Sequence, residues 1–176
     1  MFHRSERLLL RPPFAEDWQA VLSGIADKGV VRNLARAPWP YAEDDARRFV
    51  ALPVEPKYPR FLITRACDAA LIGCIGIDAT RDGVELGYWI ARPFWGQGYA
   101  TEAGRAVLGI ARLCGHERLT AGHFLDNPAS GRVLEKLGFE PTGVVGTRHS
   151  CGRGEAALCR EYMLDLADTQ EVRHAA

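Results

Sequence analysis

The stretch Phe94–Ala103, FWGQGYATEA, places two glycines between a run of strand-forming residues and the start of a helical pattern. The preceding residues 84–91, VELGYWIA, alternate in polarity as a half-buried strand does. From Thr101 to about Cys114 apolar residues recur at helical spacing, and Gly115 is a typical helix stop. Such a loop suits an anion, a pyrophosphate above all, because main-chain N–H groups and the positive end of a helix dipole meet there. The alternative is a tight connection that binds nothing.

The loop and the composition exclude several classes of protein. The loop has neither the G-x-x-x-x-G-K-[ST] pattern of nucleotide triphosphatases nor the G-x-G-x-x-G pattern of dinucleotide sites. Lys plus Arg and Asp plus Glu number 22 each in 176 residues, so the net charge favours neither nucleic acid nor an acidic membrane. The longest apolar run, 69–77, is too short to span a bilayer, and the five cysteines form no C-x-x-C pair. We expect a cytoplasmic protein with reduced thiols and no metal, nucleic-acid or membrane partner.

The remaining pattern predicts one α/β domain over residues 1–176, with a core at about 4–165 and a polar tail at 166–176. The early strands should pair antiparallel, and two later strand–helix–strand passages indicate parallel neighbours. Helices are expected at 15–25, 42–52, 101–114 and 128–137, and the segment 27–41 should be irregular. Strands are expected at 7–12, 60–65, 70–77, 84–91, 118–124, 142–147 and 157–164.

The segment 87–103, GYWIARPFWGQGYATEA, resembles the acetyl-CoA-binding segment of the GNAT superfamily of N-acetyltransferases. The family pattern is Arg or Gln, two residues, Gly, one residue, then Gly or Ala, and Trp95, Gly98 and Ala100 fill these positions. A tryptophan at the first position is typical of the RimJ/RimL-like branch, which contains ribosomal-protein N-terminal acetyltransferases. RLLLRP, PYAEDDARRF and NPASGRVLEKLGF resemble the same branch, in the same order. The resemblance implies a mixed central sheet with a splayed parallel pair that binds the coenzyme, flanked by about four helices.

The resemblance also implies where acetyl-CoA lies. The main chain of Ile90 and Arg92 would pair with the pantetheine arm, and the N–H near Ile90 would polarise the thioester carbonyl. Asn127 would contact pantetheine and Ser130 would lie near the sulfur, unless they serve only as a helix N-cap and a first-turn serine. The pyrophosphate would be held by the loop and first helical turn, formed by Trp95, Gly96, Gln97, Gly98, Tyr99, Ala100 and Thr101.

The implied chemistry is direct attack of an amine on the thioester. Many GNAT enzymes carry a tyrosine acid seven residues after the asparagine, where this chain has Leu134, so Ser130 or water would protonate the thiolate. Glu85, on the strand that leads to the thioester, is the candidate base through water, the alternative being an exposed strand carboxylate. His123 is either a proton relay or a packed histidine, and Glu102 is expected to be a first-turn helix charge.

Trp39, Tyr41 and Tyr88 are candidates to line the acceptor pocket, although the first two also suit the anchoring of their loop. An α-amine with a pKa of about 7.7–8.0 is roughly a tenth to a sixth neutral at neutral pH, and a lysine amine less than about one part in a thousand. A weak base therefore favours an amine acceptor at a protein or peptide N-terminus. A small amine such as a polyamine, an amino acid or an aminoglycoside is the first alternative, and a non-catalytic acyl-CoA-binding module is the second. A longer acyl group and a homodimer stay open.

Overall fold

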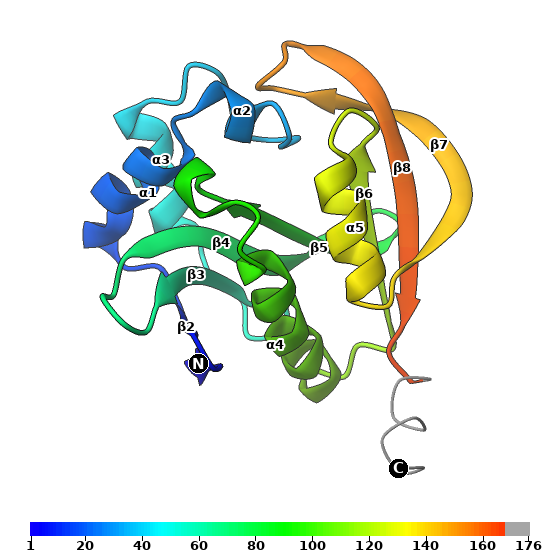
Figure 1. Ribbon diagram of the computed structural model, residues 1–176, viewed down its shortest axis with the longest axis horizontal. Helices are drawn as coiled ribbons and strands as arrows, with labels where there is room; N and C mark the ends of the chain where they lie inside the picture. Colours follow the sequence, from blue (N-terminus) through cyan, green and yellow to red (C-terminus); the bar gives the residue numbers. More distant parts are fainter. Residues whose placement is uncertain (168–176) are drawn as a thin grey trace.

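A computed structural model describes residues 1–167 (Figure 1). All but two residues of the tail expected at 166–176 lie outside this part of the chain. The helices are α1 (Trp18–Ile25), α2 (Lys28–Val31), α3 (Glu43–Ala51), α4 (Tyr99–Leu113) and α5 (Pro128–Lys136), with 3-10 turns at Ala15–Asp17 and Arg92–Phe94. The strands are β1 (His3–Arg4), β2 (Leu8–Arg11), β3 (Arg60–Arg65), β4 (Leu71–Thr80), β5 (Gly83–Ile90), β6 (Arg118–Phe124), β7 (Glu140–Ser150) and β8 (Glu155–Asp165).

The eight strands form one sheet in the order β1-β2-β3-β4-β5-β6-β8-β7. Neighbours are antiparallel except β5 and β6, which run parallel and pair at Glu85 and Thr120. The predicted mixed sheet with antiparallel early strands and a parallel pair is therefore confirmed. Five α-helices occur in the described residues instead of about four. The additional helix, α2, lies in the segment expected to be irregular, where the side chain of Asp27 accepts from the N–H groups of Gly29 and Val30.

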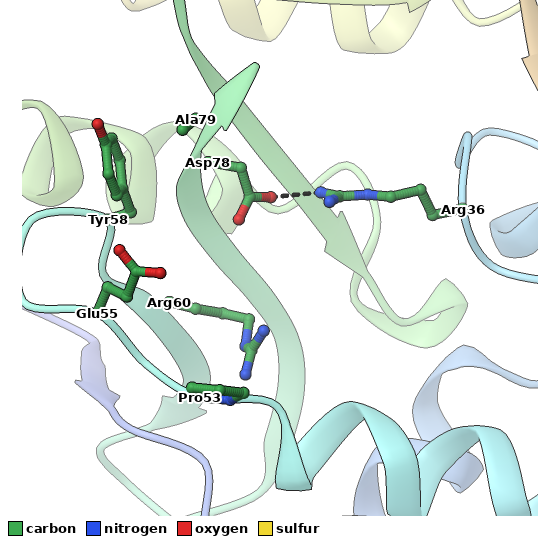
Figure 2. A pocket seen from close by; sticks show the side chains of 7 residues that line it. All are labelled: Arg36, Pro53, Glu55, Tyr58, Arg60, Asp78 and Ala79. Atoms are coloured by element: carbon green, nitrogen blue, oxygen red, sulfur yellow. Dashed lines mark hydrogen bonds and ion pairs between the residues drawn. The ribbon is translucent and has the colours of Figure 1, made fainter. Parts of the chain in front are cut away.

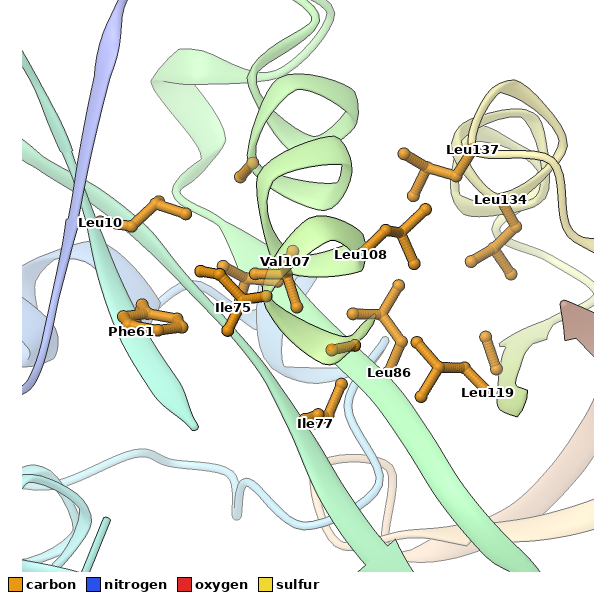
Figure 3. Close-up of a cluster of buried hydrophobic side chains, with 14 of the residues drawn as sticks. Leu10, Phe61, Ile75, Ile77, Leu86, Val107, Leu108, Leu119, Leu134 and Leu137 are labelled. Carbon is orange, nitrogen blue, oxygen red and sulfur yellow. The ribbon is translucent and has the colours of Figure 1, made fainter. Parts of the chain in front are cut away.

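Helices cover both faces of the sheet. Successive side chains of a strand point to opposite faces, and both faces carry apolar side chains that the helices bury. Leu86 of β5 packs with α4 and α5 in the larger core, where Leu108 of α4 points toward Leu134 of α5 and Val107 of α4 lies beside Ile75 of β4 (Figure 3). Trp89 of β5 points to the other face and packs with α1, α2 and α3. No helix among residues 1–167 has the length and apolar character needed to cross a membrane.

The tip of the β7–β8 hairpin arches toward α2 (Figure 1). The hydroxyl of Ser150 donates to the carbonyl of Leu34 at 2.7 Å, and the N–H of Cys151 donates to the carbonyl of Ala35 at 2.9 Å. Arg153 forms an ion pair with Asp126 at 2.7 Å, just before α5. The hairpin is thus tied to the segment after α2, and it bounds the sheet on the α1–α3 face.

Candidate active site

The gap between β5 and β6 begins just after Glu85, where their pairing ends. The N–H of Ala91 donates to the carbonyl of Ile72 at 2.8 Å, so Ala91 occupies a hydrogen-bonded position of the antiparallel β4–β5 ladder. Main-chain groups alternate in direction along such a ladder, so those of Tyr88 and Ile90 point away from β4, toward the gap. The indole N–H of Trp95 donates to the Ile90 carbonyl at 2.6 Å. The Ile90 N–H therefore faces a gap that β6 does not close.

The glycine loop lies where β5 leads into α4. Gly96 and Gly98 adopt φ angles of +74° and +80°, in the left-handed region that favours glycine. The helix begins at Tyr99, two residues before the predicted start at Thr101. The N–H groups of the first turn have no carbonyl partner within the helix. Loop and helix terminus thus place main-chain N–H groups and the positive end of the helix dipole just after β5.

Arg7 and Glu102 brace this loop from the side, and sequence reasoning did not find the arginine. The Arg7 Nε donates to Glu102 Oε2 at 2.7 Å, and its Nη1 donates to the carbonyl of Gln97 at 3.1 Å. The hydroxyl of Ser5 also donates to Glu102, at 2.7 Å. Burial opposes the charge on Glu102, but the hydrogen bonds from Ser5 and Arg7 outweigh it and hold the pKa of this carboxyl below its usual range. Glu102 is therefore more than a first-turn charge, because it ties the connection between β1 and β2 to α4.

Arg92 lies in a 3-10 turn instead of an extended segment. Its carbonyl accepts from the N–H of Trp95 at 3.2 Å, and its side chain pairs with Asp27 at 3.3 Å. The strand-like pairing with pantetheine expected at Arg92 does not fit this turn. The side chain of Gln97 folds back onto the carbonyl of Pro93 at 3.1 Å.

Glu85 points to the α1–α3 face, where it is 24% exposed and forms an ion pair with Arg148 of β7. Burial opposes the charge of Arg148, but the hydrogen bond and charge of Glu85 outweigh this effect and raise the pKa of the guanidinium. The two residues are 63 positions apart, and no local pattern marks Arg148. The contact between Arg148 and Glu85 could have been predicted only from the order of the strands in the sheet.

Ser130 lies in the first turn of α5, opposite β5. Its hydroxyl is 2.7 Å from the phenol oxygen of Tyr88, so Tyr88 lies on the helix face of the sheet and not beside Trp39 and Tyr41. Asn127 precedes the helix, but its side chain makes no capping hydrogen bond. Leu134 is 1% exposed and belongs to the core.

His123 and Tyr41 have packing partners, whereas Trp39 is exposed. His123 Nδ1 lies 2.8 Å from the Phe124 carbonyl, and its Nε2 lies 3.4 Å from the Tyr162 hydroxyl. It lies three positions after Thr120, the register partner of Glu85, so alternation places it on the opposite face from Glu85. Tyr41 is buried with α1–α3, which raises its pKa to about 12, whereas Trp39 is 40% exposed.

A cavity of about 220 Å³ opens on the Glu85 face of the sheet (Figure 2). Asp78, the cross-strand partner of Glu85, forms an ion pair with Arg36 at its edge. The Nε atom of Arg60 is buried there without a hydrogen-bond partner. The lining residues are Arg36, Pro53, Glu55, Tyr58, Arg60, Asp78 and Ala79. Residues 1–167 hold no group of three potential metal ligands, and all five cysteines are free thiols.

A mixed sheet that opens between two parallel strands, with a glycine loop at the opening, defines an N-acetyltransferase of the GNAT type. The model of the Acetyltransferase (GNAT) domain matches residues 7–140, and the chain belongs to this family. It is 32% identical over 149 residues to the uncharacterized N-acetyltransferase YoaA of Bacillus subtilis, covering 80% of this chain and 84% of the relative.

Solved structures show the same fold. The GNAT-family acetyltransferase of Bacillus anthracis superposes with a TM-score of 0.79 at 26% identity, over 95% of this chain and 99% of that one. The ribosomal-protein-S5-alanine acetyltransferase of Vibrio fischeri has the same TM-score, 0.79, at 15% identity, over 96% of this chain and 98% of the other. At that identity the likeness concerns the fold.

Proposed function

We propose that this enzyme transfers an acetyl group from acetyl-CoA directly to the α-amine of a protein or peptide N-terminus. The observation that carries the proposal is the position of the Ile90 N–H, which faces the β5–β6 gap between the glycine loop and Ser130. Family membership supports acetyl transfer, and the resemblance of the segment FWGQGYATEA, with Trp95 at its first pattern position, supports a RimJ/RimL-like enzyme.

The chain's own groups fit the coenzyme in three places. The main chain of Tyr88 and the N–H of Ile90 offer an unpaired strand edge to the pantetheine arm, so Tyr88 replaces Arg92 in this role. The loop from Trp95 to Gly98, with the first turn of α4, would hold the pyrophosphate. The side chain of Asn127, which makes no capping hydrogen bond to α5, would contact pantetheine from the α5 side of the gap.

Glu85 and Ser130 then serve the two proton movements. Glu85, on the acceptor face, would accept the amine proton through water, and Arg148 would fix the direction of the carboxylate. Ser130 would donate to the departing sulfur, whose thiol has an ordinary pKa of about 8.5 and needs little help. The Ile90 N–H would polarise the thioester carbonyl as a single oxyanion donor.

The acceptor would approach from the face that carries Glu85, Asp78 and the cavity in Figure 2. Gly87 leaves open space above the strand beside Glu85, because no heavy atom lies within 4 Å of where its Cβ would be. An extended N-terminus can lie there with its amine toward Ile90. The mixed charges of the cavity favour a second candidate acceptor, a small zwitterionic amine.

A panel of amines would test the proposal. Release of free coenzyme A should be fastest with unblocked peptides, slower with small amines, and absent with peptides blocked at the N-terminus and free of lysine. Fastest turnover with a small amine would contradict the acceptor class. Acetyl-CoA at about 100 times its Kd should stabilise the fold by about 2.7 kcal/mol. Stabilisation without turnover on any amine would identify a non-catalytic binding module instead.

A further inference from the structure

The hydroxyl of Tyr88, on β5, lies against the hydroxyl of Ser130, in the first turn of α5. Their oxygens are 2.7 Å apart, a normal distance for an O–H···O hydrogen bond. The same phenol oxygen lies 3.4 Å from the Ser130 carbonyl, which can only accept. In the 2.7 Å contact either hydroxyl could be the donor, whereas the carbonyl contact requires the phenol to donate. If the phenol shares its proton between the two Ser130 oxygens, the serine hydroxyl is the acceptor.

The donor role leaves the serine proton free. A serine hydroxyl carries one proton and two lone pairs, so a serine that accepts from Tyr88 can still donate to a third atom. Burial raises the pKa of Tyr88 to about 12, although the bond to Ser130 lowers it, so the phenol keeps its proton at neutral pH. Without that donor, a first-turn serine hydroxyl commonly turns back to a carbonyl of its own helix or of the preceding turn.

We propose that Tyr88 is a positioning residue for proton delivery, which holds the Ser130 hydroxyl so that its proton points at the coenzyme sulfur. The inference rests on the proposed function. As the amine nitrogen bonds to the acyl carbon, the C–S bond breaks and its electron pair passes to sulfur. Sulfur takes the Ser130 proton, while the proton lost by nitrogen passes through water to Glu85. The serine oxygen then regains a proton from solvent, and Glu85 returns its proton to solvent. The transfer therefore consumes no net acid.

The two variants are Tyr88→Phe, which keeps the ring in the core, and Thr64→Val, which removes a buried hydroxyl on β3, two strands away from β5. Loss of one hydrogen bond predicts that Tyr88→Phe lowers kcat about three- to tenfold, while KM for acetyl-CoA and the melting temperature stay near wild type. Thr64→Val should leave kcat unchanged. Ser130→Ala should lower kcat at least as much as Tyr88→Phe does.

The double variant gives the decisive readout. If Tyr88 acts through Ser130, adding Tyr88→Phe to Ser130→Ala lowers kcat no further. Multiplied effects of the two substitutions would show independent roles and would overturn the proposal, as would a Tyr88→Phe enzyme with wild-type kcat. If the wild-type enzyme acetylates no amine, the proposed function itself fails and this inference falls with it. An active wild type beside an unaffected Tyr88→Phe removes the inference alone.

Discussion

Replacing Gly98 with alanine should weaken the binding of acetyl-CoA. Gly98 has a φ of +80°, and an added Cβ would meet only Arg7 Nη2, at 3.6 Å, which is an ordinary contact. The cost is therefore conformational, about 1–2 kcal/mol for a residue other than glycine in the left-handed region. The loop is exposed, so in the free protein alanine is able to relax to another conformation. Most of the cost should then appear on binding, as a roughly 5- to 30-fold rise in Kd.

The matched control is Gly109→Ala on the solvent side of the same helix. No heavy atom lies within 4 Å of its added Cβ, and alanine is favoured over glycine in a helix by about 1 kcal/mol. We expect an unchanged Kd and a melting temperature about 2–4 °C higher. Titration calorimetry with acetyl-CoA and thermal unfolding measure both quantities. A Gly98→Ala protein whose Kd stays within about twofold of wild type would refute the assignment of this loop to the pyrophosphate.

Three further changes test other parts of the structure. Glu85→Gln should lower kcat/KM for a peptide by about 100-fold near pH 7 and by less at pH 9, where the amine loses its proton unaided. A variant whose kcat/KM equals that of wild type at both pH values would exclude the base role. Leu134→Ala should lower the free energy of unfolding, measured in urea, by about 2–5 kcal/mol because Leu134 is 1% exposed. Leu113→Ala, at an 84% exposed position, should lower it by less than about 0.5 kcal/mol. Equal losses for the two variants would contradict the described core. Burial opposes the charge of Asp17, but its bonds to Arg11 and the Phe14 N–H outweigh this effect and lower its pKa. The stabilisation that Asp17 gives the fold should therefore be complete above the unfolded pKa of about 3.9 and lost as pH falls through the folded value. Asp17→Asn should remove this part of the acid unfolding transition, and an unchanged transition would disprove the role of Asp17.

The features that the sequence predicts well are set by neighbouring residues. The positive φ angles of Gly96 and Gly98, the start of α5 after Asn127 and the alternation along β5 all follow from local residue preferences. The order of elements then fixes the parallel β5–β6 pair, because a helix joins the two strands.

The features that sequence reasoning missed are contacts between distant segments. Arg148 reaches Glu85 across 63 residues, Arg7 reaches Glu102 across 95, and Tyr88 reaches Ser130 across 42. Periodicity predicts which face of a strand a side chain occupies, but not which side chain of another element it meets there. Tyr88 illustrates the limit, since its position in the strand was clear while its partner was not.

The central claim is that the β5–β6 gap presents an acetyl thioester to an N-terminal α-amine. Its most direct test is a single peptide with both a free N-terminus and an accessible lysine, incubated with a small amine, acetyl-CoA and the enzyme. The products are then analysed by tandem mass spectrometry. The account predicts acetyl on the α-amine, with the lysine side chain unmodified at the same time point. Acetyl on the lysine alone, or on neither amine while a small amine is consumed, would contradict it.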